Sequence, residues 1–445
     1  MEKVLIANRG EIALRILEAC REEGLSTVAV FSEAERGALH VREAAEAICI
    51  GPADPRRSYL SIPTLIAACE VSGADALHPG YGFLSENEDL AEVCTEHGIT
   101  FIGPPPEVLH LANDKVEAKR RVAQAGVPVL PGSEPLDGEA DLMVRATELG
   151  FPLLLKAVAG GGGRGIRLVR SEEELRALLP RAREEARVAF GDGRLFLERW
   201  LPSPRHVEVQ ILADAHGHVV YWGTRDCTVQ RRHQKLVEEA PAPGLAPGQR
   251  ARLCAAAVRA ARALGYVGVG TVEFLVDGDD FYFIEVNARI QVEHPVSEVL
   301  VGRNLVREQL RLARGDPLGY EQQQVELWGH AIECRINAED PARGFLPSSG
   351  RLWIDHLPGG IGVRVDTHLY QGMEVLPYYD PLLAKVIAHG ETREEARVRL
   401  YSALRRFQVR GISTNRDLLL EIISHPDFAS GRLATDFLER LSPGL

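Results

Sequence analysis

The stretch that most constrains this chain is residues 281–295, FYFIEVNARIQVEHP, which begins as a β-strand and then turns polar at every second position. The aromatic and β-branched residues at its start favour a strand. Alternate side chains of an extended chain share one face, so the pattern predicts one polar surface made of Glu285, Asn287, Arg289, Gln291 and Glu293. The intervening residues are apolar, which indicates a buried opposite face. A solvated edge strand is the alternative, but charges fixed on a buried backbone favour a functional site.

A second strand precedes this one, and the two are predicted to form a hairpin. Residues 271–276 and 281–287 are separated by DGDD, a typical turn sequence. Counting back from the turn places Glu273 opposite Glu285, within one residue of register. Two carboxylates at that spacing repel each other unless a cation lies between them. With Asn287 nearby, the set contains only oxygen donors and suits Mg²⁺ or Mn²⁺ beside a phosphate; two charged surface strands are the alternative.

Composition excludes several classes of function. The chain has 445 residues, enough for about two to four domains, and its net charge of −12 disfavours nucleic acid or an anionic membrane as partner. No apolar run reaches membrane-spanning length, and the start, MEKVLIANRGE, is unlike a signal peptide. The seven cysteines are scattered without a CxxC pair, which indicates free thiols in a reducing cytoplasm and no structural zinc.

The first hundred residues alternate between strands and helices. Strands are expected at 4–8, 27–31, 46–50, 74–77 and 99–103, with helices that include 11–23, 61–71 and 90–97. This order predicts a parallel sheet covered on both faces. The loop HPGYGFLSEN at 78–87 follows a strand and is either a structural turn or a loop on the substrate side. The run GPPP at 103–106 indicates a domain boundary.

A phosphate site is predicted in the middle of the chain. A helix at 107–125 carries Lys115, a strand at 153–157 carries Lys156, and the glycine run AGGGGRG follows at 159–165. Backbone without side chains can approach a phosphate closely, although a flexible surface hairpin is the alternative; the Walker pattern is absent. Only six of the 51 basic residues are lysine, and a phosphate site favours the compact lysine charge.

Three further stretches carry polar residues. Strands at 195–200 and 206–212 carry Glu198 and His206, and the segment RDCTVQRRHQK at 225–235 is predicted to be an anion-binding loop, with a solvated loop as the alternative. The next stretch, 236–243, shows no periodicity and is expected to be irregular. From about residue 328 a further α+β unit is predicted, with a strand at 330–338 that has Glu333 and Arg335 on one face and a helix at 391–406.

These features describe an ATP-using ligase whose phosphates lie between two α+β lobes. From end to end, the sequence resembles the biotin carboxylase family of the ATP-grasp superfamily, and most closely the free-standing subunits of bacterial acetyl-CoA carboxylase. The stretches that carry the resemblance are IANRGEIALRI, HPGYGFLSEN, KAVAGGGGRG, RDCTVQRRHQK, FIEVNARIQVEHPV, ECRINAEDP and YYDPLLAK.

The resemblance implies a fold that mixes α/β and α+β parts. It predicts an ATP-grasp fold with an N-terminal parallel α/β domain at 1–112, an ATP-grasp domain at 113–328 and a C-terminal α+β domain at 329–445. A mobile glycine-rich lid is expected at about 130–203.

The resemblance also implies a role for each site residue. ATP would be contacted by Lys115, Lys156, His206, Gln230 and His233, by Gly162 and Gly163 of the lid, and by the adenine hinge Glu198, Arg199, Trp200 and Leu201. Metal ions would be held by Glu273, Glu285 and Asn287. Bicarbonate would be bound by Lys235, Arg289, Gln291, Val292 and Glu293, with Glu293 as the general base. Arg335 would stabilise the biotin enolate, and Tyr81 would lie near biotin.

The implied reaction is the carboxylation of biotin with ATP, Mg²⁺ or Mn²⁺ and bicarbonate, through carboxyphosphate. Biotin is expected on a separate carrier protein, since no lysine here is flanked by methionine. Carboxyltransferase subunits are further expected partners, a homodimer is common in the family, and fatty acid synthesis is the expected pathway. Two residues depart from the family pattern: Arg199 replaces a common lysine, and Val158 replaces a small residue before the glycine run.

Three alternatives stay open at this point. The chain could serve propionyl-CoA or pyruvate carboxylation, it could be another ATP-grasp ligase, or it could be a non-catalytic nucleotide-binding regulatory subunit. The strings QVEHP and RRHQK argue against another ligase. A regulatory subunit would be expected to have a broken site, and here the charged residues are all present: Glu273, Glu285, Arg289, Glu293 and Arg335.

Overall fold

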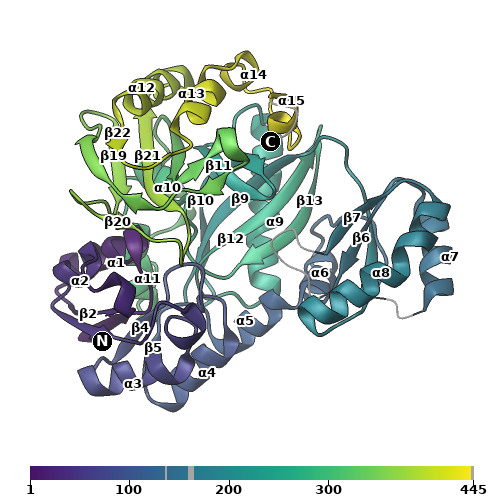
Figure 1. Ribbon diagram of the computed structural model, residues 1–445. Helices are drawn as coiled ribbons and strands as arrows, with labels where there is room; N and C mark the ends of the chain where they lie inside the picture. Colours follow the sequence, from purple (N-terminus) through teal and green to yellow (C-terminus); the bar gives the residue numbers. More distant parts are fainter. Residues whose placement is uncertain (136–137, 159–164, 442–445) are drawn as a thin grey trace.

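The N-terminal part is a parallel α/β unit, as the sequence predicts. The computed structural model describes residues 1–135, 138–158 and 165–441. The first sheet has the order β3-β2-β1-β4-β5, with all neighbours parallel. Its strands are β1 (Lys3–Ile6), β2 (Ser26–Phe31), β3 (Glu46–Cys49), β4 (Ala76–His78) and β5 (Thr100–Phe101). Its helices are α1 (Gly10–Glu22), α2 (Leu39–Glu43), α3 (Ile62–Ser72) and α4 (Glu88–Glu96) (Figure 1).

Both faces of this sheet are buried, which explains its apolar strands. Val4 and Ile6 of β1 pack into one hydrophobic cluster with α1, whereas Leu5 packs into another with α3 and α4. β1 and β4 lie side by side and run parallel, so the loops that follow these two strands meet at the same edge of the sheet.

The helix predicted at 107–125 is in fact two helices, and this expectation was wrong. α5 (Pro106–Asn113) ends at Asp114, and α6 (Lys115–Gln124) begins immediately after it. The Asp114 side chain accepts hydrogen bonds from the backbone N–H groups of Val116 and Glu117, so it caps the second helix. The break places Lys115 in the first turn of α6.

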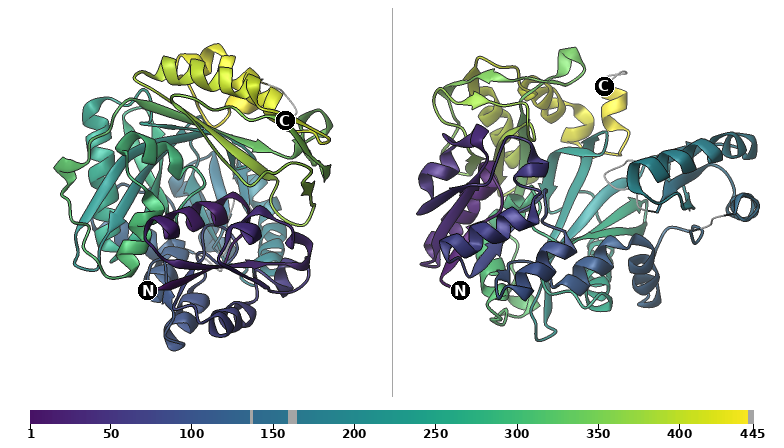
Figure 2. Two further views of the ribbon diagram at one scale, coloured as in Figure 1. Left: turned by 90° about the vertical axis from the view of Figure 1, so that its left-hand side faces the viewer. Right: turned by 60° about the horizontal axis from the view of Figure 1, so that its bottom comes forward.

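A small lobe projects from the body of the molecule (Figures 1 and 2). Its antiparallel sheet has the order β7-β6-β8, and α7 and α8 pack on it around one apolar cluster. The elements are β6 (Leu153–Ala157), β7 (Ile166–Val169), β8 (Leu195–Arg199), α7 (Glu139–Leu149) and α8 (Glu172–Phe190). Most of the glycine run lies outside the described residues.

One large antiparallel sheet runs through the rest of the molecule. Its order is β13-β12-β9-β10-β11-β14-β21-β19. The strands are β9 (Arg205–Ala213), β10 (Val219–Arg231), β11 (Gln234–Ala240), β12 (Gly268–Asp277), β13 (Asp280–Asn287), β14 (His330–Asn337), β19 (Val363–Thr367) and β21 (Leu382–Gly390). Strand β11 pairs directly with β14, so the sheet continues from the middle of the chain into its C-terminal part.

Strand β11 corrects a second expectation, because residues 236–243 were predicted to be irregular. The structure has a strand from Gln234 to Ala240, and residues 236–240 are all buried. A strand buried on both faces shows no hydrophobic alternation, and here the pairing is also interrupted by a bulge. For both reasons, the sequence of this strand does not show the alternation of apolar and polar residues from which a strand is usually predicted.

Helices cover both faces of this large sheet. α9 (Pro247–Ala263) packs on β9, β10 and β12, and α10 (His294–Val301) packs on β10, β11, β14 and β21. α12 (Arg393–Arg406) covers β21 and β14 within a C-terminal apolar cluster. The other helices after the lobe are α11 (Leu305–Ala313), α13 (Arg416–Ser424), α14 (Pro426–Ala429) and α15 (Phe437–Leu441).

Short strand pairs complete the C-terminal part. They are β15 (Glu339–Asp340) with β16 (Leu346–Pro347), β17 (Gly350–Arg351) with β20 (Glu374–Val375), and β18 (Trp353–His356) with β22 (Gln408–Arg410). Among the helices of the described residues, none is both long and apolar enough to span a membrane.

Candidate active site

A β-bulge places the two predicted metal-binding carboxylates face to face. Glu273 of β12 pairs with Glu285 of β13, as predicted, and Phe274 pairs with Phe283. The extra residue, Ile284, shifts the register by one between these pairs. Without the shift Glu285 and Phe283 would share a face. With it, Phe283 is fully buried in the core whereas Glu285 is partly exposed beside Glu273.

The alternation beyond β13 does not continue, so that part of the first expectation was wrong. The strand ends at Asn287, and residues 288–293 form an irregular turn before α10. The side chains nevertheless converge: the Asn287 and Gln291 amides donate to Glu273 Oε1 at 2.8 and 3.0 Å. The convergence therefore comes from the turn and not from an extended strand.

Lys235 lies at the centre of the site. Its Nζ is 2.7 Å from Glu208 Oε2, 3.0 Å from Glu273 Oε1 and 2.6 Å from Glu293 Oε1. Burial alone would lower the pKa of Lys235, but the surrounding acidic groups outweigh this and raise it well above its usual value. Lys235 is therefore a fixed positive charge that joins the predicted metal ligands to the predicted base.

Glu293 is held between two cations. It is 1% exposed, and its second oxygen accepts a hydrogen bond from Arg335 Nη2 at 2.8 Å. Burial would raise the pKa of Glu293, but Lys235, Arg335 and Arg225 together hold it well below the usual range for a carboxyl. Glu293 is thus ionised, and its basicity depends on how tightly these cations hold it.

A second bulge brings Lys235 and Glu238 to the same face of β11. Gln230 pairs with Lys235 and Val229 pairs with Val237, so Leu236 is the extra residue. Glu238 Oε1 then accepts a hydrogen bond from Arg335 Nε at 2.6 Å. As predicted, Arg335 and Glu333 share one face of β14, because Cys334 between them packs into the opposite apolar cluster.

The turn after β13 is held by residues from other parts of the chain. Glu86, in the loop after β4, accepts hydrogen bonds from the Arg289 Nε at 2.8 Å and from the Ala288 N–H at 3.0 Å. The Val292 carbonyl accepts from Lys385 Nζ at 3.0 Å. This hydrogen bond fixes the backbone at Val292, and the expected contact of Val292 with bicarbonate stays a prediction.

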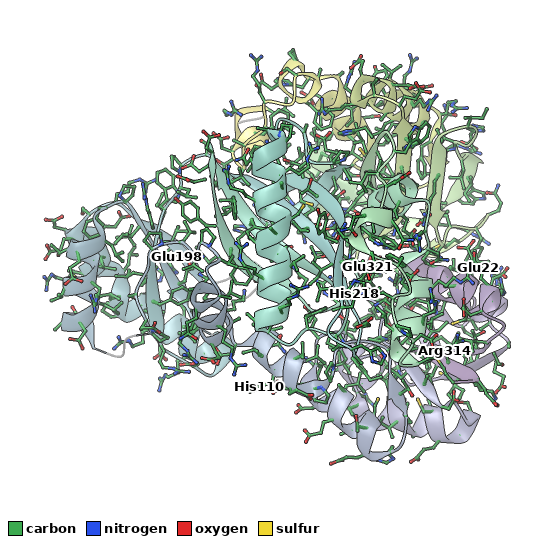
Figure 3. All side chains as sticks on the ribbon, turned by 180° about the vertical axis from the view of Figure 1, so that it is seen from behind. Glu22, His110, Glu198, His218, Arg314 and Glu321 are labelled. Atoms are coloured by element: carbon green, nitrogen blue, oxygen red, sulfur yellow. The ribbon has the colours of Figure 1, made fainter. Side chains whose placement is uncertain are left out.

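The predicted phosphate-binding lysines are paired with carboxylates. Lys115 Nζ lies 2.7 Å from Glu285 Oε2. Lys156 pairs with one oxygen of Glu198, and Lys119 pairs with the other. Burial would raise the pKa of Glu198, but Lys119 and Lys156 lower it below the usual value. Figure 3 shows Glu198 in the projecting lobe. The Lys119 pair therefore ties the lobe to α6, whereas the Lys156 pair lies within the lobe.

His206 and Gln230 lie beside the metal ligands. His206 Nε2 is 3.1 Å from Glu273 Oε2, and its Nδ1 is 2.8 Å from the Gln230 amide nitrogen. Burial would lower the pKa of His206, but Glu273 raises it above the usual value. Both predicted nucleotide contacts therefore adjoin the predicted metal site.

The predicted adenine hinge, residues 198–201, lies at the end of β8. Leu201 is buried, Trp200 is half-buried, and the Arg199 side chain is exposed. The backbone N–H of Arg199 donates to the Pro131 carbonyl at 2.8 Å, which fixes the backbone at this position. The presence of arginine where the family usually has lysine therefore changes a side chain that faces solvent. Gly162 and Gly163 lie outside the described residues.

The predicted anion-binding loop at 225–235 is a hairpin, and the expectation of a cation cluster was wrong. Arg225 is fully buried and donates to Glu208, Gln210 and Gln291. Arg231 stacks on the Phe345 ring, 3.6 Å from its centroid. His233 is exposed at the turn. Arg225 and Lys235 therefore both contact Glu208, whereas Arg231 packs on Phe345 instead. Of the predicted site residues in this segment, which are Gln230, His233 and Lys235, it is Lys235 that contacts the carboxylates of Glu208, Glu273 and Glu293.

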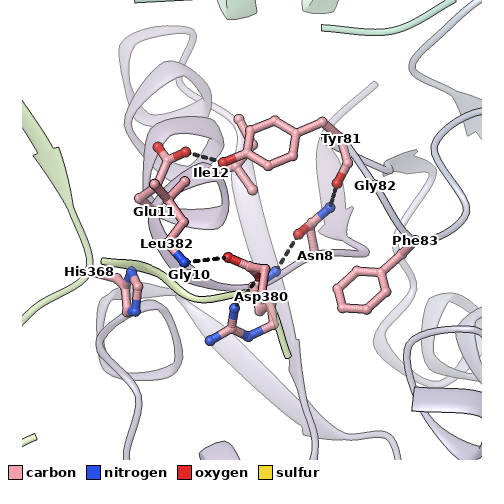
Figure 4. A pocket seen from close by; sticks show the side chains of 11 residues that line it. Asn8, Gly10, Glu11, Ile12, Tyr81, Gly82, Phe83, His368, Asp380 and Leu382 are labelled. Carbon is pink, nitrogen blue, oxygen red and sulfur yellow. Dashed lines mark hydrogen bonds and ion pairs between the residues drawn. The ribbon is translucent and has the colours of Figure 1, made fainter. Parts of the chain in front are cut away.

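Tyr81 lines a pocket of about 180 Å³ between the N-terminal sheet and the C-terminal part (Figure 4). The pocket lies at the edge where the loops after β1 and β4 meet. The Tyr81 hydroxyl donates to Glu11, and burial raises the pKa of Tyr81 well above its usual value. Arg9, at the start of α1, bridges Glu35 and Asp380 in the same region.

Sequence reasoning did not assign roles to five residues that support this site. They are Glu86, Lys119, Glu208, Arg225 and Lys385. Glu86, Arg225 and Lys385 lie inside the motifs that carried the resemblance, which was the available signal. Lys119 had a weaker signal, since it is one of the six lysines.

The residues present fit a magnesium ion. Glu273, Glu285 and Asn287 offer only oxygen ligands, which a hard divalent cation prefers. Their charges are balanced here by the ammonium groups of Lys235 and Lys115. These carboxylates therefore need positive charge beside them, which the two lysines supply here and which a magnesium ion would share.

Comparisons with known proteins agree with this geometry. Residues 1–109 match the family described as biotin carboxylase, N-terminal domain, and residues 333–440 match the biotin carboxylase C-terminal domain. Residues 114–321 match the ATP-binding domain of the carbamoyl-phosphate synthase L chain. A biotin carboxylase of Pseudomonas aeruginosa is 52% identical over 443 residues, which cover 99% of this chain and 98% of that protein.

The chain belongs to the biotin carboxylase family.

Other biotin carboxylase relatives are similar over nearly their whole length. A biotin carboxylase of Haemophilus influenzae is 51% identical and covers 99% of this chain and 98% of that protein. A crystal structure of a Campylobacter jejuni biotin carboxylase in complex with β,γ-ATP has a TM-score of 0.95 and 46% identity, covering 99% and 98%. The biotin carboxylase domain dimer of the Hydrogenobacter thermophilus 2-oxoglutarate carboxylase, solved with MgADP and bicarbonate, has a TM-score of 0.94 and 46% identity, covering 99% and 97%.

Proposed function

We propose that this chain uses ATP and bicarbonate to carboxylate biotin that is attached to a separate carrier protein. The observation that carries the proposal is the position of Glu293. It is buried, shared between Lys235 and Arg335, and joined through Lys235 to Glu273 of the predicted metal site. A base for bicarbonate, a cation for its charge and a site for the ATP phosphates therefore lie within one network.

We propose that the nucleotide is bound where the lobe meets the body of the molecule. Lys115, Lys156 and His206 contact the phosphates or ribose, with Gln230 and His233 as further contacts. Gly162 and Gly163, which lie outside the described residues, are assigned to the ATP phosphates by the family resemblance, and residues 198–201 are assigned to adenine. Glu273, Glu285 and Asn287 would hold Mg²⁺, which would neutralise charge at the transferring phosphoryl group.

In the first step, Glu293 acts as a general base. Lys235, Arg289, Gln291 and the Val292 backbone hold bicarbonate while one of its oxygens attacks the γ-phosphorus. The bond between that phosphorus and the ADP oxygen breaks, and the proton of bicarbonate passes to a Glu293 oxygen. The products are ADP and carboxyphosphate.

Charge competition explains how a carboxylate with a depressed pKa can take this proton. In the ligand-free protein, Lys235 and Arg335 hold Glu293 in its ionised form. Bicarbonate and the ATP phosphates bring negative charge that competes for the same cations. As these cations turn toward the substrates, the pKa of Glu293 rises toward its ordinary value and its basicity increases.

In the second step, carboxyphosphate breaks down to CO₂ and phosphate. The phosphate takes the N1 proton of biotin, and the resulting nitrogen attacks CO₂ to give carboxybiotin. Arg335 faces the ureido oxygen and stabilises the negative charge of the enolate. Tyr81, which lines the pocket shown in Figure 4, is proposed to lie near biotin.

We propose acetyl-CoA as the final acceptor, with the carboxyl carrier protein and carboxyltransferase subunits as partners. This assignment is supported by relatives named biotin carboxylase, which this chain matches over 98% of their length. A homodimer is proposed because the similar biotin carboxylase domain of the 2-oxoglutarate carboxylase is described as a dimer. The seven free cysteines support a reducing cytoplasm.

A second acceptor is favoured by one specific comparison. A pyruvate carboxylase subunit of Methanothermobacter thermautotrophicus is 46% identical and covers 100% of this chain and 90% of that protein. The half-reaction on biotin is the same for both acceptors, so the two candidates differ only in the partner that receives the carboxyl group.

The test measures ATP hydrolysis by the purified chain with and without bicarbonate and free biotin. We expect hydrolysis to require bicarbonate and to increase when biotin is added, with carboxybiotin as product. Hydrolysis that is indifferent to both compounds would show that the chain is not a biotin carboxylase.

A further inference from the structure

Two buried carboxyl groups face each other behind the proposed base. Glu238 of β11 and Glu333 of β14 are directly paired across neighbouring antiparallel strands, and both are 0% exposed. Paired residues on such strands point to the same face, with Cβ atoms about 4.5–5.5 Å apart. α10 covers this face of the sheet.

The pair has too few hydrogen-bond donors for two ionised carboxylates. Glu238 Oε1 accepts from Arg335 Nε at 2.6 Å. Within the described part of the chain, its other oxygen and both oxygens of Glu333 have no hydrogen-bond partner. An ionised carboxylate that is buried without partners is costly, whereas one shared proton supplies a donor and removes the repulsion.

The charged groups around the pair are committed elsewhere. Lys385, on β21, contacts Glu11, Asp366 and the Val292 carbonyl. Lys235, on β11, contacts the carboxylates of the site. Arg335 from β14 and Glu293 from the start of α10 complete the charged surroundings, with the thiol of Cys334 beside both carboxyl groups and that of Cys227 beside Glu238.

The expected charge states agree with this geometry. Burial raises the pKa of Glu238 to about 7, although Arg335 opposes the shift. Burial also raises the pKa of Glu333 well above its usual value, with Lys385 opposing it. Both shifts favour the protonated form, so the pair holds a proton more tightly than two ordinary carboxyl groups would.

We propose that Glu238 and Glu333 share one proton and act as positioning residues for Arg335. This inference rests on the proposed function. The Arg335 guanidinium bridges Glu238 and Glu293, with Nη2 2.8 Å from Glu293 Oε2. When Glu293 takes the proton of bicarbonate it loses its charge, and Glu238 then keeps the guanidinium at the site for the biotin step.

The proton on the pair matters for the second step. With one proton, the pair carries a single negative charge that balances Arg335. Loss of that proton adds a second negative charge, which competes with the developing biotin enolate for the guanidinium. Biotin carboxylation should therefore decline at alkaline pH more strongly than the cleavage of ATP that depends only on bicarbonate.

The experiment measures two rates from about pH 6 to about pH 9. One is biotin carboxylation, and the other is bicarbonate-dependent ATP hydrolysis without biotin. Their ratio isolates the step in which Arg335 acts on biotin. In the wild type we expect this ratio to fall as pH rises. A wild-type ratio that stays constant would overturn the inference without any variant.

Two variants separate the roles of the pair. Glu333→Gln cannot ionise and resembles the protonated acid, so the alkaline fall of the ratio should disappear. Glu238→Gln removes the hold on Arg335, so the ratio should drop about tenfold at every pH and the KM for biotin should rise. Glu238→Asp, which keeps the carboxylate, should restore part of the ratio.

Glu239→Gln is the matched control. Glu239 is the next residue of β11 and is also buried, but it faces His330 at 2.8 Å and Arg393 at 2.6 Å. Its replacement should leave the ratio and its pH dependence as in the wild type. A Glu333→Gln profile that superimposes on the wild type, or a Glu238→Gln variant that loses both rates in parallel, would overturn the inference. Absence of any bicarbonate-dependent hydrolysis in the wild type would instead refute the proposed function.

Discussion

Replacement of Lys235 by methionine should make the stability of the protein depend on pH and on magnesium. Lys235 is the cation between three carboxylates, and the side chains of Glu208, Glu273 and Glu293 are at most 6% exposed. Removing one partner of a buried ion pair typically costs about 3–5 kcal/mol, because the remaining charges stay buried. We expect Lys235→Met to lower the free energy of unfolding by about that amount near neutral pH.

The pH dependence has a definite sign. In the wild type the pKa values of Glu273 and Glu293 are lowered in the folded state. Their contribution to stability is therefore present above the unfolded pKa of about 4.3 and is lost as pH falls toward the folded values. In the variant this lowering is reduced, so the difference between the two proteins should shrink on acidification below about pH 5.

The assay is urea denaturation followed by tryptophan fluorescence, since Trp222 is buried. Magnesium should recover part of the lost stability in Lys235→Met, because a divalent cation can replace the missing charge. Lys3→Met is the control: Lys3 pairs with the exposed Glu46, and its loss should cost less than about 1 kcal/mol. A Lys235→Met variant that is as stable as the wild type near neutral pH, or a difference independent of pH, would refute this reasoning.

Two other changes have clear expected outcomes. Lys119→Met leaves Glu198 with Lys156 as its partner, so Lys156 is less free to bind phosphate. Initial-rate kinetics should show a KM for ATP that rises about five- to tenfold, with kcat little changed. An unchanged KM would contradict this role of the Lys119–Glu198 pair. Arg232→Gly should stabilise the hairpin by about 0.5–1 kcal/mol, since Arg232 has a φ of 47° in the turn between β10 and β11; a lower melting temperature would show that the arginine side chain is needed there.

The order of elements could be predicted from the sequence because each part follows a simple period. The N-terminal strands and helices alternate, and both faces of the sheet are apolar, so the parallel α/β unit was predicted with nearly correct bounds. The hairpin of β12 and β13 was also predicted, since its turn sequence is distinctive. Helix capping was missed at Asp114, where one side chain splits a continuous helical pattern into two helices.

The bulges could not be predicted, and they decide the site. Counting residues places Glu273 opposite Glu285 only within one position, and the extra residue Ile284 settles the register. Likewise, Leu236 brings Lys235 and Glu238 to one face, although their spacing in a regular strand would separate them. Such insertions depend on packing between strands that are distant in sequence.

The charges of the segment 225–235 show the limit of local reasoning in the same way. The sequence shows a dense run of cations and predicts an anion-binding loop. In the structure Arg225 neutralises Glu208 inside the core, whereas Arg231 covers Phe345. Whether a cation is available to a ligand depends on carboxylates elsewhere in the chain, so the side-chain partners must be known.

The most direct test of the central claim follows an oxygen atom. In the proposed reaction an oxygen of bicarbonate attacks the γ-phosphorus, while Glu293 takes the proton. With bicarbonate labelled with oxygen-18, the account predicts that the phosphate released during biotin carboxylation carries one labelled oxygen. Glu293→Gln should reduce this labelled phosphate in parallel with carboxybiotin. Phosphate without label would mean that water attacks ATP, and the proposed role of the Lys235, Glu293 and Arg335 network would be contradicted.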